Sequence, residues 1–237
     1  MTPSIMELLG FGSQGWGLLL LKAAGVTLSA AVCGFFLGSL LGICGATLKL
    51  ARPPLFRWVG QFYTTVFRGV PEILVVYLFY FGGSVVLTKA MNTGGFIGFY
   101  SLPAFAIGVI AVGVVSGAYQ TEAYRSAFLR LDRGQLEAGA SCGMPKLLLL
   151  RRIIAPQTLR FALPALGNIW QSVLKETSLL SVIGLIELLR QAGTAAGSTR
   201  LPLLFYGVAG LMFLIIGRAT GFFLIRMESH LAKPWSR

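Results

Sequence analysis

The sequence contains an uninterrupted run of 26 residues without a charged side chain, Ala23–Leu48. A helix of about 20 apolar residues is long enough to cross the hydrocarbon core of a bilayer. The run is followed by Lys49 and Arg52 and not by a small-residue cleavage site, which argues against a signal peptide. Charged residues make up only 12% of the chain, against about 25% in a typical soluble domain. We therefore predict an integral membrane protein, and we exclude a disordered chain, a secreted disulfide scaffold and a cytosolic enzyme.

Other apolar segments extend this prediction to an all-α protein with five transmembrane helices in one domain, residues 1–237. The predicted spans cover about residues 18–48, 58–88, 101–129, 155–187 and 201–227. The fourth span is the least regular, because Lys175 and Glu176 interrupt it and it contains Pro164. Further helices outside the bilayer are expected only in the longer loops.

The positions of lysine and arginine predict the orientation, because cytoplasmic loops retain an excess of them. Eleven lie on one side of the predicted spans: Lys49, Arg52, Arg57, Arg130, Arg133, Lys146, Arg151, Arg152, Arg160, Lys233 and Arg237. Three lie on the other side: Lys89, Arg190 and Arg200. With five spans, the N-terminus is then periplasmic and the C-terminus cytoplasmic. The net charge of +12 is explained by these loops, so we expect no nucleic-acid partner.

Metal chemistry has little support in the sequence. Cys33, Cys44 and Cys142 lack the C-x-x-C spacing of metal sites, and His230 is the only histidine. We therefore predict no metal ligands and no catalytic residues on this chain.

The longest cytoplasmic connection lies between the third and fourth predicted spans. Within it, Gln135–Cys142 can form a short amphipathic helix, with Leu136 and Ala140 four residues apart on one face. Gly143 suits the end of such a helix, where the backbone turns left-handed. The helix could dock into a soluble partner, or it could simply lie at the membrane interface.

The residues of this connection resemble a known family motif. Glu137-Ala138-Gly139, Gly143 after three intervening residues, and Ile153-x-x-Pro156 resemble the "EAA" loop of ABC importer permeases. The spacing matches throughout, although Gly139 and Ala155 replace the family's alanine and leucine. The resemblance implies a coupling loop over about 131–147 that contacts an ATPase. The implied coupling residues are Glu137, Ala138, Gly139, Gly143, Ile153 and Pro156.

The resemblance extends over residues 20–230. Arg68-Gly-Val-Pro71 resembles the R-G-x-P element of polar amino-acid permeases, and similar matches occur at 118–125, 161–171 and 174–181. The nearest likeness is to the "Q" permease subunits of histidine and opine importers. It implies the ABC importer type I permease fold in a bacterial inner membrane, and a basic amino acid or opine as substrate. It also implies ATPase subunits that bind ATP and Mg, a second permease chain, homologous or identical, and a periplasmic substrate-binding protein.

The chain itself lacks a nucleotide site. A P-loop reads G-x-x-x-x-G-K-[ST], and Gly143-Met-Pro-Lys146 has the wrong spacing and no following hydroxyl. We therefore predict no cofactor on this chain. The alternative is a secondary amino-acid carrier that uses no ATPase, although no internal repeat typical of such carriers is visible. A scaffold protein would not need charges within its spans.

Charged residues near the membrane mark candidate sites. Arg68 and Glu72 are four residues apart, and Glu122 and Arg125 are three apart, so each pair could share a helix face. At both places structural pairing is favoured over substrate contact.

Lys175 and Glu176 are adjacent, and adjacent side chains point about 100° apart on a helix. At least one of them therefore needs another partner, such as water or a zwitterionic ligand. Arg218 in the fifth predicted span could pair with Glu176 or with Glu122, or extend to the membrane interface. A helix break near the surface is the competing interpretation. The candidate substrate-pathway residues are Lys175, Glu176, Thr177, Ser178, Glu122 and Glu72.

Overall fold

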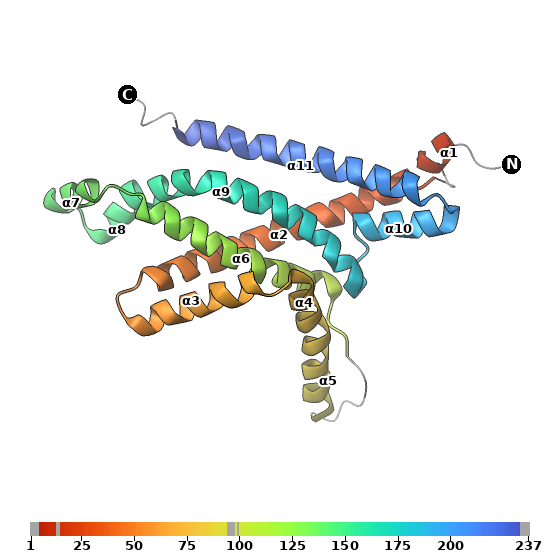
Figure 1. Ribbon diagram of the computed structural model, residues 1–237, viewed down its shortest axis with the longest axis horizontal. Helices are drawn as coiled ribbons and strands as arrows, with labels where there is room; N and C mark the ends of the chain where they lie inside the picture. Colours follow the sequence, from red (N-terminus) through yellow and green to blue (C-terminus); the bar gives the residue numbers. More distant parts are fainter. Residues whose placement is uncertain (1–4, 13–14, 94–97, 99, 233–237) are drawn as a thin grey trace.

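The computed structural model describes residues 5–12, 15–93, 98 and 100–232. These residues form helices joined by short connections, and none of them lies in a strand, so the all-α prediction is confirmed. Four long helices run side by side along the molecule (Figure 1): α2 (Gly17–Leu50), α6 (Ala104–Leu129), α9 (Ala155–Glu176) and α11 (Pro202–Ala232).

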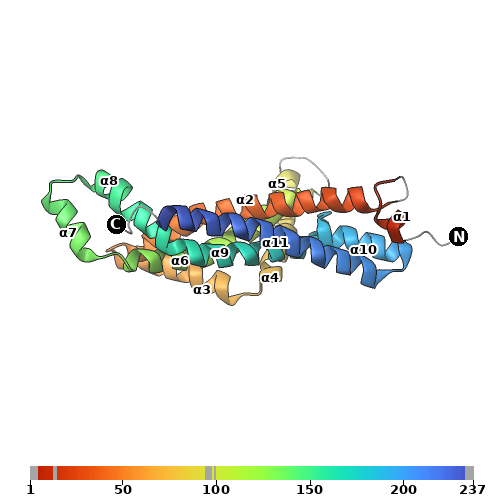
Figure 2. The same ribbon diagram turned by 90° about the horizontal axis from the view of Figure 1, so that it is seen from above.

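The shorter elements lie at the two ends and on one flank of these four helices. They are α1 (Ile5–Leu9), α3 (Pro54–Gly69), α4 (Glu72–Tyr77), the π-helical η1 (Leu78–Gly82), α5 (Gly83–Thr93), α7 (Arg133–Ser141), α8 (Lys146–Leu149), the π-helical η2 (Leu150–Ile154), the 3₁₀ helix η3 (Thr177–Ile183) and α10 (Leu188–Thr199). Both views place α7 and α8 at one end of the molecule and α1 and α10 at the other (Figures 1 and 2).

Glycines of α2 allow it to lie directly against α6. A Cβ on Gly38 would stand 2.1 Å from Ser116 Oγ, and a Cβ on Gly45 would stand 2.3 Å from Thr121 Oγ1. Neither position can therefore carry a side chain at this separation. Small residues of this kind permit close helix packing in membranes, where apolar burial gives little driving force. The pair α2–α6 forms the frame on which the other helices pack.

Four helical segments among the described residues are long and apolar enough to cross a bilayer: Gly17–Leu50, Glu72–Thr93, Ala104–Leu129 and Pro202–Phe223. The helix at the predicted fourth span, α9, has 22 residues, a sufficient length, but it carries more polar side chains than a lipid-exposed span. It ends at Glu176, where the chain continues as the 3₁₀ helix η3.

The predicted second span, 58–88, contains a sharp break. Val70 and Pro71 have extended backbone, with ψ of 138° and 131°, between α3 and α4. A residue before proline is disfavoured in the helical region, which explains why the helix ends here. After the break, α4, η1 and α5 leave the bundle as an arm (Figure 1). This arm exposes large apolar side chains, including Leu78 at 69% and Val86 at 68%.

The helix α9 is held in place by a buried tryptophan. Trp170 packs edge-on against Phe35 of α2, with ring centroids 5.5 Å apart. Its Nε1 donates a hydrogen bond to Thr220 Oγ1 of α11 at 2.9 Å. These contacts fix the rotation of α9, and therefore the directions in which the side chains near its C-terminal end point.

Candidate functional site

Two carboxyl groups from different helices meet in one small cavity. Glu72 is the first residue of α4, and Glu176 is the last residue of α9. Both side chains line this cavity and lie close enough to interact electrostatically. The cavity has a volume of about 230 Å³, and the polar groups of Ser116, Tyr119, Asn168 and Ser172 also line it.

The charged residues that line this cavity are both acidic. Apart from those polar residues, Ile169 and Val173 complete the lining, and no lysine or arginine is among the lining residues. Asn168 and Ser172 are exposed, so the cavity opens to the surface of α9. Two carboxyl groups beside neutral hydroxyl and amide groups attract a cation, because only cations gain from both of them.

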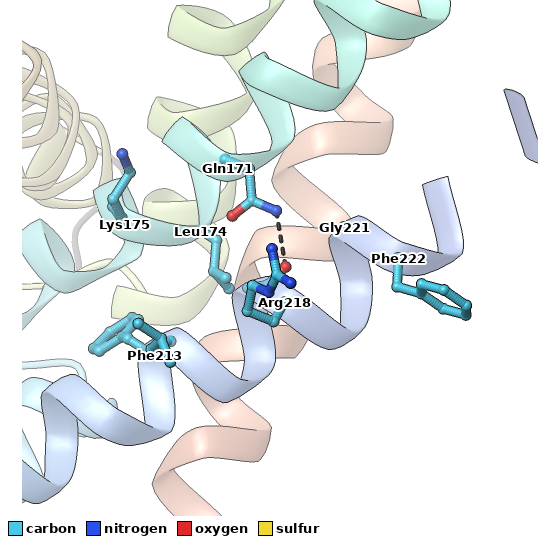
Figure 3. Close-up of a pocket in the computed structure, with 9 residues that line it drawn as sticks. Gln171, Leu174, Lys175, Phe213, Arg218, Gly221 and Phe222 are labelled. Carbon is cyan, nitrogen blue, oxygen red and sulfur yellow. Dashed lines mark hydrogen bonds between the residues drawn. The ribbon is translucent and has the colours of Figure 1, made fainter. Parts of the chain in front are cut away.

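Lys175 lines a second cavity and is not among the lining residues of the acidic one. The second cavity lies between α9 and α11, with a volume of about 520 Å³, and Gln171, Lys175 and Arg218 line it (Figure 3). Gln171 Nε2 donates to the carbonyl of Gly217 at 2.9 Å and joins the two helices. Lys175 and Glu176 therefore line different cavities. Arg218 pairs with neither Glu176 nor Glu122 among the described ion pairs.

Figure 3 shows that Lys175 and Arg218 extend in different directions and do not converge on one point. Lys175 and Glu176 line different cavities, and their joint contact with one zwitterion stays a prediction. Gln171 was not among the predicted site residues. Its spacing of four residues from Lys175 was the available signal, because it places both on one face of α9.

Glu122 belongs to an ion cluster that joins α2, α3 and α6. It forms an ion pair with Lys49, and a longer one with Arg125, with Nη1 and Oε2 3.6 Å apart. Lys49 Nζ also donates to Thr64 Oγ1 at 2.9 Å, and the Lys49 side chain is only 7% exposed. The predicted pairing of Glu122 with Arg125 is confirmed. The contribution of Lys49 was missed, because it requires two helices to meet.

The predicted pair of Arg68 and Glu72 is wrong. The extended backbone at Val70 and Pro71 separates the two residues, so they do not share a helix face. Arg68 instead lies over the Tyr119 ring, with its Cζ 5.3 Å from the centroid. Glu72 is thereby left available for the acidic cavity.

The two hydroxyl groups that follow Glu176 both donate hydrogen bonds to backbone carbonyls. Thr177 is fully buried, and its hydroxyl donates to the carbonyl of Leu174 at 2.7 Å. Ser178 donates to the carbonyl of Lys175 at the same distance. Both bonds satisfy carbonyl groups where α9 changes into a 3₁₀ helix. In this arrangement the two hydroxyls stabilise a helix end.

The connection between the third and fourth predicted spans forms a compact hairpin. Its first helix, α7, is capped by Asp132, whose side chain accepts from the backbone N–H of Gly134 at 2.8 Å. Gly143 follows α7 with a φ of +76°, which confirms the expected left-handed backbone. The buried face differs from the prediction: Gly139 is buried and Ala140 is exposed.

Gly139 is buried because the returning chain packs on it. A Cβ at this position would lie 2.6 Å from Leu149 Cδ1 and 3.2 Å from Ile153 Cδ1. The glycine therefore makes room for two bulky side chains from α8 and η2. Glu137 and Ala138, next to it, are exposed on the outer side of the hairpin. Pro156 is the second residue of α9 and directly follows the π-helical segment η2.

Comparison with known proteins identifies close relatives of the whole chain. The sequence profile of the family described as "Binding-protein-dependent transport system inner membrane component" matches residues 34–228. The octopine transport system permease protein OccQ of Rhizobium radiobacter is 47% identical over 91% of this chain and 91% of its own. The histidine/lysine/arginine/ornithine transport system permease protein HisQ of Escherichia coli (strain K12) is 33% identical over 90% and 93%.

Solved structures give the same result for the fold. The crystal structure of an amino acid ABC transporter with histidines contains a chain that is 27% identical, with a TM-score of 0.77. The match covers 97% of this chain and 100% of that chain. A chain of the MetNI methionine ABC transporter, at 18% identity and a TM-score of 0.72, shares the fold over 91% of this chain.

Proposed function

The chain belongs to the family of binding-protein-dependent transport system inner membrane components, and on this basis we propose that it imports cationic amino acids or opines. It is a permease subunit of an ABC importer, and not itself an enzyme. Two relatives support this substrate class: OccQ is a permease protein for octopine, and HisQ is one for histidine, lysine, arginine and ornithine. ATP and Mg bind to partner ATPase chains, and a periplasmic binding protein delivers the substrate.

The acidic cavity is the observation that carries the substrate proposal. Glu72 and Glu176 together place two carboxyl groups where no basic residue lines the wall. The ammonium or guanidinium group of a cationic substrate would donate hydrogen bonds to both carboxyl groups. Neutral amino acids of similar size gain nothing from the second carboxyl group. We assign the cavity to the transport path.

Charge removal at the cavity tests this assignment. Glu176→Gln and Glu72→Gln keep the side-chain shape, so the complex should assemble normally and lose uptake of cationic substrates. Lys175→Gln is the matched control on the same helix, because it removes a charge outside the cavity. Uptake of a panel of cationic and neutral amino acids measures the effect. Unchanged preference in both glutamine variants would contradict the proposal.

The remaining candidate residues take supporting roles in this proposal. Glu122 is engaged by Lys49, and Thr177 and Ser178 are engaged by backbone carbonyls. We therefore assign these three residues to the architecture around the path. Lys175 lies in the neighbouring cavity and would influence substrate only through its long-range charge.

The hairpin of α7 and α8 is the proposed coupling loop, about 131–147. Glu137 and Ala138 are exposed and available to a socket on the ATPase, whereas Gly139, Gly143, Ile153 and Pro156 shape the hairpin behind them. The capped helix and the packed glycine support this division of roles, because a rigid element transmits movement better than a mobile loop. Closure of the ATPase would then move α9 through η2.

We further propose that α9 is a fifth span, shielded from lipid by its neighbours. Its polar residues line the two cavities, and Trp170 anchors it between α2 and α11. With five spans in a bacterial inner membrane, the excess of lysine and arginine supports a cytoplasmic position for α7 and α8. The N-terminus is then periplasmic and the C-terminus cytoplasmic.

A second permease chain would complete the path. An apolar hollow of about 580 Å³ lies at the break between α3 and the arm, and its lining includes Phe67, Leu74 and Phe81. The arm is anchored in the bundle through the buried Val75 and Val76 of α4, but it exposes large apolar side chains such as Leu78 and Val86 farther along. A homologous or identical chain that packs against this arm would bury both surfaces. No observation favours the alternative of an ATP-independent carrier.

A further inference from the structure

A second apolar hollow lies at the end of the bundle that carries the proposed coupling loop. It has a volume of about 510 Å³ and is formed by the last turns of α2 and α6 together with η2 and the start of α9. Its lining includes Ile43, Leu50, Phe128, Leu150, Ile154 and Leu159. We call it the inner groove. Its size falls within the range of about 300–1,000 Å³ that is typical of ligand pockets.

Arginines follow the lining residues closely in the chain. Arg52 comes directly after the lining residue Ala51, and Arg151 comes directly after Leu150. Arg130 caps α6 two residues beyond the lining residue Phe128. All three arginines are exposed. Within the described part of the chain, no ion pair involves any of them. Figure 1 shows the ends of α2 and α6 and the start of α9 at the same end of the bundle.

An apolar groove at an arginine-rich end of a membrane protein matches one class of molecule. A phospholipid has an acyl chain that requires an apolar contact surface and a phosphate that requires cations. Clusters of arginine at the cytoplasmic face recognise anionic headgroups in particular. We propose that the inner groove holds an acyl chain of an anionic phospholipid, and that Arg52, Arg130 and Arg151 bind its headgroup.

This lipid would act on coupling. One wall of the inner groove is η2, the π-helical segment that joins the coupling loop to α9. An acyl chain against Leu150 and Ile154 would support η2 while ATPase closure moves the loop. The inference uses the proposed orientation, but it is independent of the substrate and of the acidic cavity.

The test uses the complete complex of permease chains, ATPase and binding protein in vesicles of phosphatidylcholine with or without phosphatidylglycerol. Substrate-stimulated ATP hydrolysis should be higher with phosphatidylglycerol, and the purified complex should retain that lipid in mass spectrometry. Removing two arginines in Arg52→Gln with Arg151→Gln should weaken retention about 30-fold, because each basic residue near an anionic surface contributes about fivefold.

Two further variants separate the groove from general surface charge. Thr47 is an exposed residue of the lining, so Thr47→Phe fills the groove without a change of charge and should abolish retention. Arg57→Gln removes an exposed charge on α3 that, unlike Arg52 and Arg151, does not adjoin a lining residue in the chain, and it should behave as the wild type.

Three results would overturn the proposal. The first is equal retention of the two lipids, and the second is wild-type lipid dependence in the double arginine variant. The third is failure of Thr47→Phe to assemble with its partner chains, which would assign the groove to a protein interface. Import by the wild type in pure phosphatidylcholine tests the transport function separately, so the two proposals can fail independently.

Discussion

Replacement of Gly143 by alanine should weaken coupling through the backbone alone. Gly143 has a φ of +76°, and an added Cβ would meet no atom within 4 Å. The cost is therefore purely conformational, about 1–2 kcal/mol for an L-residue in the left-handed region. That energy corresponds to about a 5- to 30-fold shift of the loop away from its native geometry. Asparagine tolerates this region better than alanine, so Gly143→Asn should lose less.

The assay is ATP hydrolysis by the reconstituted complex, with and without substrate-loaded binding protein. Basal hydrolysis and membrane levels should stay near wild type, while stimulation falls in the order wild type, Gly143→Asn, Gly143→Ala. Gly167→Ala is the matched control, because Gly167 lies inside α9 with open space for a Cβ and without a left-handed φ. Equal stimulation in the wild type and Gly143→Ala, or an equal loss in Gly167→Ala, would refute the reasoning.

Three other predictions follow from the same contacts. Glu137→Lys reverses an exposed charge on α7, so membrane levels should stay normal while less ATPase co-purifies; unchanged co-purification would remove Glu137 from the docking surface. Gly139→Val should reduce substrate-stimulated ATP hydrolysis, because over-packing against Leu149 costs about 1–3 kcal/mol. Adding Leu149→Ala should restore the stimulated hydrolysis. Absence of this restoration would contradict the packing argument. Glu122→Gln should destabilise the permease by about 3 kcal/mol in thermal unfolding, because Lys49 is left buried without its carboxylate. Adding Lys49→Met should recover most of this loss. Additive losses in the double variant would argue against the ion pair.

Local patterns were sufficient for much of the fold. The charge-free run Ala23–Leu48 predicts most of α2, because a helix in lipid needs only length and apolarity. Gly143 could likewise be identified from its position after a helix pattern, since the left-handed turn is a property of a few neighbouring residues. Each of these two features is determined by residues within one continuous stretch of the sequence.

The candidate site depends on contacts between distant segments, and here sequence patterns were weaker. Glu72 and Glu176 meet only because α4 leaves the bundle beside the end of α9. The predicted pairing of Arg68 with Glu72 assumed a continuous helix, although Pro71 was a visible signal of a break. The partner of Glu122 across the helix pair, Lys49, follows from packing that no local pattern encodes.

The central claim is that this chain forms part of an ATP-driven import path for cationic substrates. The most direct measurement is uptake by proteoliposomes that contain the permease chains, ATPase and binding protein, with radiolabelled cationic and neutral amino acids and opines. The account predicts accumulation that requires both ATP and the binding protein, and that favours cationic substrates in the wild type but not in Glu176→Gln. Accumulation without ATP, or equal uptake of cationic and neutral substrates by the wild type, would contradict it.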